Sequence, residues 1–192
     1  MNKLVFATHS EHKLDELKAM LPEFSVYGLK DIDIHDDIEE NGQTLTENAC
    51  IKASYLYAKS GMTALAEDTG LEVFALDGQP GVHTARYAGD QRDPLDNMNK
   101  LLSALEGQHD RSAQFRTVIT LVNDEETLYF EGIVTGRIGE TMSGTAGFGY
   151  DPVFIPDGYD KSFAELDIDI KNQISHRAKA VEKLKTYLNE WK

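Results

Sequence analysis

The segment from Thr8 to Lys13 combines hydroxyl, imidazole and ammonium groups at the expected junction of a strand and a helix. Its residues are Thr8, His9, Ser10, Glu11, His12 and Lys13. The first turn of a helix has unpaired backbone N–H groups and the positive end of the helix dipole, and Lys13 adds a full charge. This junction predicts a phosphate-binding site. The segment lacks the pattern of a P-loop, and an ordinary capped helix is the alternative.

Two adjacent carboxylates, Glu67 and Asp68, precede Thr69 and Gly70 where a strand is expected to end in a turn. Carboxylate oxygens are preferred ligands of Mg²⁺, and a carboxylate in this place can also orient or deprotonate a water molecule. Glu39 and Glu40, in an acidic stretch earlier in the chain, are candidate additional ligands. The alternative for these acids is a solvated acidic loop.

A glycine-rich loop over residues 143–152 contains two aromatic side chains, Phe148 and Tyr150. Glycines allow the backbone to approach a ligand closely, and an aromatic ring can stack on a planar base. The loop is therefore a candidate base-binding site, and a β-bulge with two core aromatics is the alternative.

Cations from two other parts of the chain are candidates for the same ligand. Lys52 stands one helical turn after Asn48, so both side chains occupy one face of the expected helix. Lys171, His176 and Arg177 lie near the expected start of the last helix, where the helix dipole disfavours cations unless an anion or an acceptor-rich ligand is bound. The alternative for each group is a basic helix surface.

The elements that must position these groups alternate between strands and helices. Apolar runs and alternation predict strands over residues 4–7, 62–66, 71–76, 114–122, 127–138 and 153–155. Helical spacing predicts helices over residues 14–21, 45–60, 94–105 and 174–188. Thr44 and Glu47 are expected to form a capping box before the second helix, which should end at Gly61, and Asp93 is expected to cap the third with Pro94 at its first position. The strands over residues 114–122 and 127–138 are expected to form a hairpin. We therefore expect an α/β fold with a mixed sheet. No linker or repeat divides the sequence, which predicts one continuous domain over residues 1–192.

The composition excludes several classes of protein. The 192 residues include 19 basic and 33 acidic side chains, for a net charge of −14, and 41% are hydrophobic. The apolar share excludes a disordered chain, and the charge opposes binding to nucleic acid or an anionic membrane. Cys50 is the only cysteine, so no intrachain disulfide can form. The sequence has no apolar run of signal-peptide or membrane-spanning length, and we expect a cytoplasmic protein.

Taken in order, these segments resemble the inosine/xanthosine triphosphate pyrophosphatase family, which hydrolyses non-canonical purine nucleoside triphosphates to monophosphates and pyrophosphate. The resemblance rests on residues 7–13, 40–44 with 47–53, 66–71, 80–81 with 85–89, 147–152, and Lys171 with 174–177. It implies an elongated mixed β-sheet flanked by helices in two lobes, with the nucleotide in a central cleft. It also implies a Mg²⁺ requirement, a homodimer, and a role in keeping these nucleotides out of DNA and RNA.

The resemblance also assigns roles by position. Asp68 matches the catalytic base and metal ligand, and Glu40 and Glu67 match further acidic positions near the metal. Substrate-binding positions are matched by Thr8, His9, Ser10, Glu11, His12, Lys13 and Lys52 for the phosphates, and by Thr69, Phe148, Gly149, Tyr150, Asp151, Lys171, His176 and Arg177 for the rest of the nucleotide. The chain departs from the family pattern at Ser10, where Asn is usual, and at Glu67, where Asp is common.

The sequence therefore predicts a Mg²⁺-dependent pyrophosphatase of ITP, dITP and XTP, in which a water activated by the metal and Asp68 attacks the α-phosphorus. Donors from His176 or Arg177 would favour a 6-oxo purine over adenine. Two alternatives stay open. One is a nucleotide-binding module without turnover, and the other is a pyrophosphatase of the same fold for other modified nucleotides such as pyrimidines.

Overall fold

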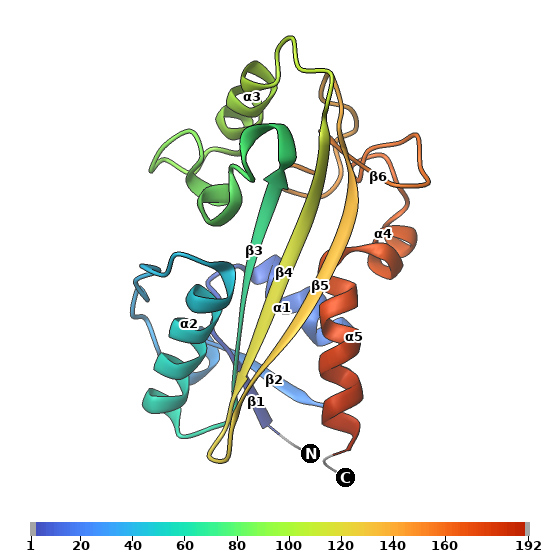
Figure 1. The fold of residues 1–192 in the computed structure, drawn as a ribbon. Helices are drawn as coiled ribbons and strands as arrows, with labels where there is room; N and C mark the ends of the chain where they lie inside the picture. The colour runs from blue at the N-terminus through green and yellow to red at the C-terminus, as the bar shows by residue number, and fades with distance from the viewer. Residues whose placement is uncertain (1–2, 191–192) are drawn as a thin grey trace. The chain divides into compact units, whose positions relative to one another are not determined.

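The chain alternates between strands and helices around one mixed sheet, and the computed structural model describes residues 3–190 (Figure 1). The strands are β1 Lys3–Phe6, β2 Ser25–Gly28, β3 Ala64–Val73, β4 Ser112–Val122, β5 Thr127–Ile138 and β6 Phe154–Pro156. The α-helices are α1 Glu11–Met20, α2 Leu45–Ser60, α3 Pro94–Ala104, α4 Ile168–Ile174 and α5 His176–Asn189, and the 3-10 helices are η1 Lys30–Ile32, η2 Phe74–Leu76 and η3 Gly81–Arg86. The strand order is β2-β1-β3-β4-β5-β6, with β1 parallel to β2 and β3 and with β5 antiparallel to β6. The expected α/β fold with a mixed sheet is confirmed.

The chain divides into two compact units. The first unit comprises residues 1–68, 117–132 and 178–192, and the second comprises residues 69–116 and 133–177. Strands β3, β4 and β5 each contribute residues to both units. A single domain over residues 1–192 stays a prediction, and each unit is described by itself.

In the first unit, alternate residues of β1 pack on opposite faces of the sheet. Leu4 and Phe6 belong to a core with residues of α1 and α5, whereas Val5, together with Ala7 directly after the strand, belongs to a core with residues of α2. This division follows from the two-residue period of a strand. Helices α1 and α2 therefore cover opposite faces of the sheet beside β1.

Local signals placed several helix ends correctly. Thr44 caps α2 in a capping box with Glu47, and Gly61 ends the helix in the left-handed conformation with φ of 63°. Asp93 caps α3 with Pro94 at its first position. The hairpin of β4 and β5 is also as predicted.

The sequence predicted two separate strands over residues 62–66 and 71–76. This division is wrong, because β3 is one continuous strand from Ala64 to Val73. Glu67 and Asp68 therefore lie inside a strand and not at a turn. Each carboxylate has a cationic partner on its own face of the sheet, which makes the acids compatible with a buried strand. Residues 74–76 form the 3-10 helix η2.

The predicted last helix is also divided. Ile174 ends α4, Ser175 has an extended backbone with ψ of 157°, and α5 begins at His176. Strand β2 and helix α4 were not predicted as elements. Among residues 3–190, no helix combines the length and the apolar character needed to cross a membrane.

The second unit has a core of its own, built on the ends of β3, β4 and β5, on α3 and on β6. Its largest buried side chains include Leu71, Leu101, Phe154 and Phe163. Arg111 supports this unit by donating hydrogen bonds to the carbonyl oxygens of Leu105, Ile138 and Gly139 at 3.0, 2.8 and 2.7 Å, respectively.

Candidate functional site

The carboxyl end of β1 is a topological switch point of the sheet, because the connections to its two neighbouring strands lie on opposite sides of it. Helix α1 leads from β1 to β2 on one side of β1, and α2 leads into β3 on the other side. The pairing of β1 with β3 stops at Phe6 and Leu65, although β3 continues to Val73. Ligands of α/β proteins bind outside the carboxyl ends of the strands at such a switch point. The segment after β1 and the acids of β3 thus meet at the place where a site is expected.

The predicted phosphate segment forms the turn from β1 into α1. Ser10 caps the helix, and its hydroxyl oxygen accepts a hydrogen bond from the backbone N–H of Lys13 at 3.4 Å. The Thr8 hydroxyl oxygen in turn accepts from the backbone N–H of Ser10 at 3.1 Å. The His9 and His12 side chains are exposed. This geometry presents the start of a helix together with hydroxyl groups, as a phosphate site requires.

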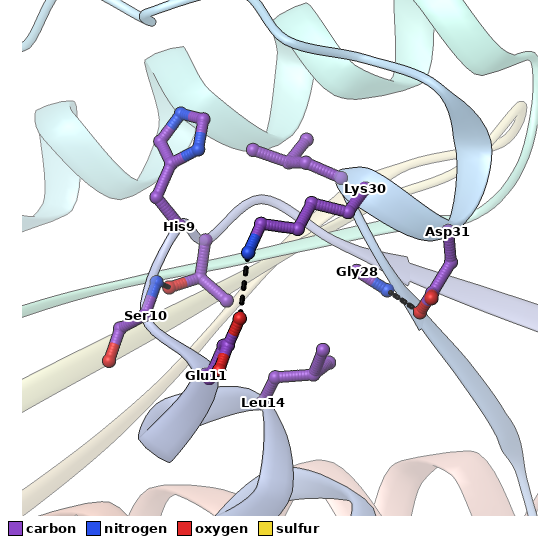
Figure 2. A pocket seen from close by; sticks show the side chains of 9 residues that line it. His9, Ser10, Glu11, Leu14, Gly28, Lys30 and Asp31 are labelled. Atoms are coloured by element: carbon purple, nitrogen blue, oxygen red, sulfur yellow. Dashed lines mark hydrogen bonds and ion pairs between the residues drawn. The ribbon is translucent and has the colours of Figure 1, made fainter.

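A pocket of about 200 Å³ lies beside this segment, between the carboxyl ends of β1 and β2. Figure 2 shows Lys30 of η1 reaching Glu11 of α1, where an ion pair forms at 2.7 Å. The same figure shows Asp31 accepting a hydrogen bond from the backbone N–H of Gly28 at 2.8 Å. The pocket is lined by Thr8, His9, Ser10, Glu11, Leu14, Gly28, Leu29, Lys30 and Asp31. Four of these residues belong to the predicted phosphate segment, whereas Lys30 and Asp31 had not been identified from the sequence.

The acids divide into two groups, because consecutive strand residues point to opposite faces of a sheet. Glu67 faces α1, and its carboxylate contacts the Lys13 ammonium at 3.0 Å. Asp68 faces α2, and its carboxylate contacts the Lys52 ammonium at 3.3 Å. Lys52 also contacts the Glu40 carboxylate at 2.5 Å. Lys52 therefore joins Glu40 and Asp68 in one cluster, and Lys13 is paired with Glu67.

Burial and neighbouring charges shift the ionisation of this cluster. Burial raises the pKa of Asp68, and the Glu40 carboxylate raises it further, while Lys52 and Lys13 oppose the shift. Burial acts to lower the pKa of Lys52, but the charges of Asp68 and Glu40 outweigh it, so that the pKa of Lys52 is raised. Lys52 thus stays positively charged, and Asp68 is a better proton acceptor than an exposed aspartate.

The donor set of this cluster fits Mg²⁺. Glu40 and Asp68 both lie within hydrogen-bonding distance of one cation, the Lys52 ammonium, so their oxygens converge on one region. Within residues 3–190, no three His, Cys, Asp or Glu side chains are grouped so as to hold a metal ion. Proteins commonly bind Mg²⁺ through one or two carboxylates, with waters and substrate phosphates completing the coordination, so two carboxylates suffice. A role for Glu67 as a third ligand stays a prediction, since its observed contact is Lys13.

In the second unit, Asp151 organises the glycine-rich loop and a buried lysine. Its Oδ2 atom accepts a hydrogen bond from the Lys171 ammonium at 2.6 Å and another from the backbone N–H of Phe148 at 2.8 Å. Gly147 has φ of 77°, and a Cβ atom there would lie 2.1 Å from the same oxygen. The loop therefore requires glycine at position 147 and fixes the backbone of Phe148.

Phe148 is 43% exposed, and its ring lies near two cationic groups of the same unit. The Lys171 ammonium is 5.1 Å and the Arg177 guanidinium 5.5 Å from the ring centroid. The buried His176 ring stacks on Phe115, with centroids 4.6 Å apart and planes at 17°. An exposed ring beside Lys171 and Arg177, with His176 next to Arg177 in the chain, suits a planar base that carries hydrogen-bond acceptors.

The other predicted contacts of this unit are less accessible. Tyr150 is buried and donates its hydroxyl hydrogen to the carbonyl oxygen of Thr84 at 2.9 Å, and burial raises the pKa of its phenol. Gly149 has φ of 61°, and Thr69 is half-buried in β3. Stacking of the Tyr150 ring on a base stays a prediction.

Sequence reasoning did not assign a role to Asn48 or to Phe115. Asn48 is fully buried and contacts Asp68, and its helical spacing from Lys52 was the only signal. For Phe115 the sequence carried no signal, because its contact with His176 joins residues of β4 and α5 that are distant in the chain.

Comparison with known proteins identifies the family. Residues 4–187 match the Ham1 family. The dITP/XTP pyrophosphatase of Flavobacterium johnsoniae is 52% identical over 183 residues, which are 95% of each chain. The dITP/XTP pyrophosphatase of Porphyromonas gingivalis is 48% identical over 190 residues, which are 98% of each chain. The solved structure of the Staphylococcus aureus Ham1 protein superposes with a TM-score of 0.93 at 40% identity and covers 100% of both chains. The chain described here is therefore a member of the Ham1 family.

Proposed function

We propose that this chain is a Mg²⁺-dependent nucleoside-triphosphate pyrophosphatase that hydrolyses dITP, ITP and XTP to the monophosphate and pyrophosphate. Relatives about half identical to it over nearly the full chain are named dITP/XTP pyrophosphatases. The observation that carries the proposal is the ion-paired cluster of Asp68, Lys52 and Glu40 beside the phosphate segment at the carboxyl end of β1. Both signs of charge, which hydrolysis of a phosphate anhydride needs, are present there.

The site residues of the first unit have separate roles in this reaction. Asp68 orients the attacking water and accepts its proton, aided by a pKa raised by burial. Lys52, Lys13 and the first N–H groups of α1 stabilise negative charge that develops on the phosphate oxygens. Glu40 and Asp68 would hold Mg²⁺, which when bound neutralises phosphate charge and polarises the phosphate oxygens.

Base selectivity is proposed to depend on residues of the second unit. The exposed Phe148 ring offers a stacking surface. His176 and Arg177 would donate hydrogen bonds toward a 6-oxo group. An adenine 6-amino group would place a donor against these donors and leave them without acceptors, which costs about 1–3 kcal/mol per buried group. Selection for inosine and xanthosine follows from that cost.

The test measures pyrophosphate and monophosphate release from ITP, dITP, XTP, GTP and ATP, with Mg²⁺ and with EDTA. We expect turnover of ITP, dITP and XTP, weak turnover of ATP, and loss of activity in EDTA. Asp68→Asn should lower kcat by about 10²- to 10⁴-fold, the contribution typical of general acid–base catalysis. Asp124→Asn, at an exposed turn between β4 and β5, is the matched control and should keep full activity.

Four outcomes would contradict this proposal. Equal rates for ATP and ITP would refute the base selectivity, and unchanged turnover by Asp68→Asn would refute the role of Asp68. Calorimetric binding of ITP without hydrolysis would favour a binding module, and a preference for modified pyrimidine triphosphates in an enlarged panel would favour a different pyrophosphatase.

The proposal includes a cytoplasmic homodimer that does not bind nucleic acid. The net charge of −14 supports the last point, because the summed field repels polyanions. The homodimer rests on the family resemblance. Light scattering coupled to size exclusion tests it, and a monomer at all concentrations would contradict it.

A further inference from the structure

We propose that Asn48 is a positioning residue of the reaction. Its side-chain amide fixes the orientation of the Asp68 carboxylate and ties it to the loop that carries Glu40. The inference rests on the proposed function of Asp68 and adds a residue to which neither the sequence motifs nor the family resemblance gave a role.

Two hydrogen bonds place the Asn48 amide between the loop and the strand. The side chain is 1% exposed on α2. Its Oδ1 atom accepts a hydrogen bond from the backbone N–H of Gly42 at 2.8 Å, and its Nδ2 atom donates to Asp68 Oδ2 at 3.3 Å. Because a backbone N–H can only donate, the atom that faces Gly42 must be the oxygen. The amino group is therefore the atom that faces Asp68.

Asp68 is held by two donors from one face of α2. Lys52 contacts Oδ1 at 3.3 Å, and Asn48, one helical turn before it, contacts Oδ2 at 3.3 Å. With one donor on each oxygen, rotation of the carboxylate about its last torsion breaks at least one contact. Without Asn48 this broad torsion is restrained by Lys52 alone. A proton acceptor has to be oriented toward its water, so this restraint affects the chemical step.

The second bond fixes the Glu40 loop. Gly42 lies so close to α2 that a Cβ atom there would be 2.7 Å from Asn48 Oδ1. Glu47 holds the next residues, since its carboxylate accepts hydrogen bonds from the backbone N–H groups of Gln43 and Thr44 at 2.6 and 3.2 Å. Glu40 is two residues before Gly42, so the hydrogen bond from Gly42 to Asn48 restrains the position of Glu40. The Glu40 carboxylate shares the Lys52 ammonium with Asp68.

Two variants separate these bonds. Asn48→Ala removes both, whereas Asn48→Asp keeps the volume and the acceptor for Gly42 but removes the donor to Asp68. We measure kcat and KM for ITP with Mg²⁺, and separately the hydrogen exchange of the Gly42 amide in protein without metal or nucleotide. Both variants should lose kcat by about 10- to 100-fold, with a smaller change in KM. Exchange at Gly42 should accelerate in Asn48→Ala but not in Asn48→Asp.

Asn97 provides a matched control. It is 3% exposed, donates from Nδ2 to the carbonyl oxygen of Ala85 at 3.0 Å, and accepts from the backbone N–H of Ala88 at 2.6 Å. Both partners are backbone groups of the second unit, whereas Asp68 belongs to the first unit. Asn97→Ala should lower thermal stability as much as Asn48→Ala while kcat and Gly42 exchange stay at wild-type values.

The proposal is overturned if Asn48→Asp keeps the wild-type kcat, if Asn97→Ala loses as much kcat as the Asn48 variants, or if Gly42 exchange in Asn48→Ala is unchanged. If Asn48→Ala fails to fold, the kcat of Asn48→Asp still tests the role of the donor to Asp68. If the wild-type protein hydrolyses no triphosphate, the proposed function fails by itself, and the exchange of the Gly42 amide still supports or refutes the tie between Asn48 and the loop.

Discussion

Replacing Lys52 with methionine removes the cation between two carboxylates while keeping the length of the side chain. The Lys52 and Asp68 side chains are 11% and 14% exposed, and Glu40 is 33% exposed. Removing one partner of a buried ion pair costs about 3–5 kcal/mol, because the remaining charge is left uncompensated. Since Glu40 reaches solvent in part, we expect the lower end, a loss of about 3 kcal/mol in the free energy of unfolding near pH 8.

The loss should depend on pH with a definite sign. Burial raises the pKa of Asp68 and Lys52 opposes the shift, so without Lys52 the pKa of Asp68 rises further. An acid whose pKa is higher in the folded state stabilises the fold when protonated, and this stabilisation is lost as pH rises above its unfolded pKa of about 3.9. The deficit of Lys52→Met should therefore shrink as pH falls from about 8 toward about 5, as Asp68 takes up a proton.

Urea denaturation of the metal-free protein, followed by far-UV circular dichroism at both pH values, measures this deficit. Lys59→Met is the control on the same helix, because Lys59 is half exposed and meets Asp36 at 3.5 Å on the surface. It should change stability little at either pH. Lys52→Met combined with Asp68→Asn should recover part of the loss. A deficit in Lys52→Met that is independent of pH, or no larger than that of Lys59→Met, would refute the reasoning.

Three further changes test other parts of the structure. Gly147→Ala places a Cβ atom 2.1 Å from Asp151 Oδ2 and should raise KM for ITP by roughly 10- to 100-fold; Gly158→Ala, also at positive φ but with open space around it, should leave steady-state kinetics unchanged. Tyr150→Phe should cost about 1 kcal/mol in a denaturant titration, because the hydroxyl of Tyr150 donates to the carbonyl oxygen of Thr84. Burial raises the pKa of the Tyr150 phenol, so this cost should shrink as pH rises above about 10, and an alkaline absorbance titration of the variant should lack one phenol that ionises above the ordinary range. Thr44→Ala should cost about 1 kcal/mol by removing the capping box of α2, and an unchanged denaturation midpoint would contradict this.

The elements that the sequence predicted well are those whose signals are local. The capping box of Thr44 and Glu47 and the Asp93-Pro94 start of α3 depend on hydrogen bonds within one turn, and both are confirmed. The hairpin of β4 and β5 is local in the same sense. Such patterns are visible because the interacting groups are neighbours in the chain.

The prediction of two strands in place of the continuous β3 was wrong, because the extended chain at Glu67 and Asp68 is stabilised by residues distant in the sequence. Glu67 to Gly70 has the composition of a turn, but Lys13 and Lys52 provide partners for the two acids from α1 and α2. With these partners the chain stays extended through Val73. No spacing along the sequence shows that Lys52 lies within reach of both Asp68 and Glu40.

For the candidate site, the family resemblance gave the assignments and is confirmed by the match to the Ham1 family. The structure added the contacts between the site residues. Glu67 and Asp68 face different helices, and Asn48 joins Asp68 to the Glu40 loop. These relations depend on the two-residue period of β3 and on the position of α2, which the sequence left open.

Hydrolysis of ITP in ¹⁸O-labelled water, with mass analysis of the separated products, tests the central claim most directly. Attack of a water oriented by Asp68 at the α-phosphorus predicts inosine monophosphate that carries one ¹⁸O atom and unlabelled pyrophosphate. Release of the diphosphate with inorganic phosphate, or ¹⁸O in the pyrophosphate, would contradict it.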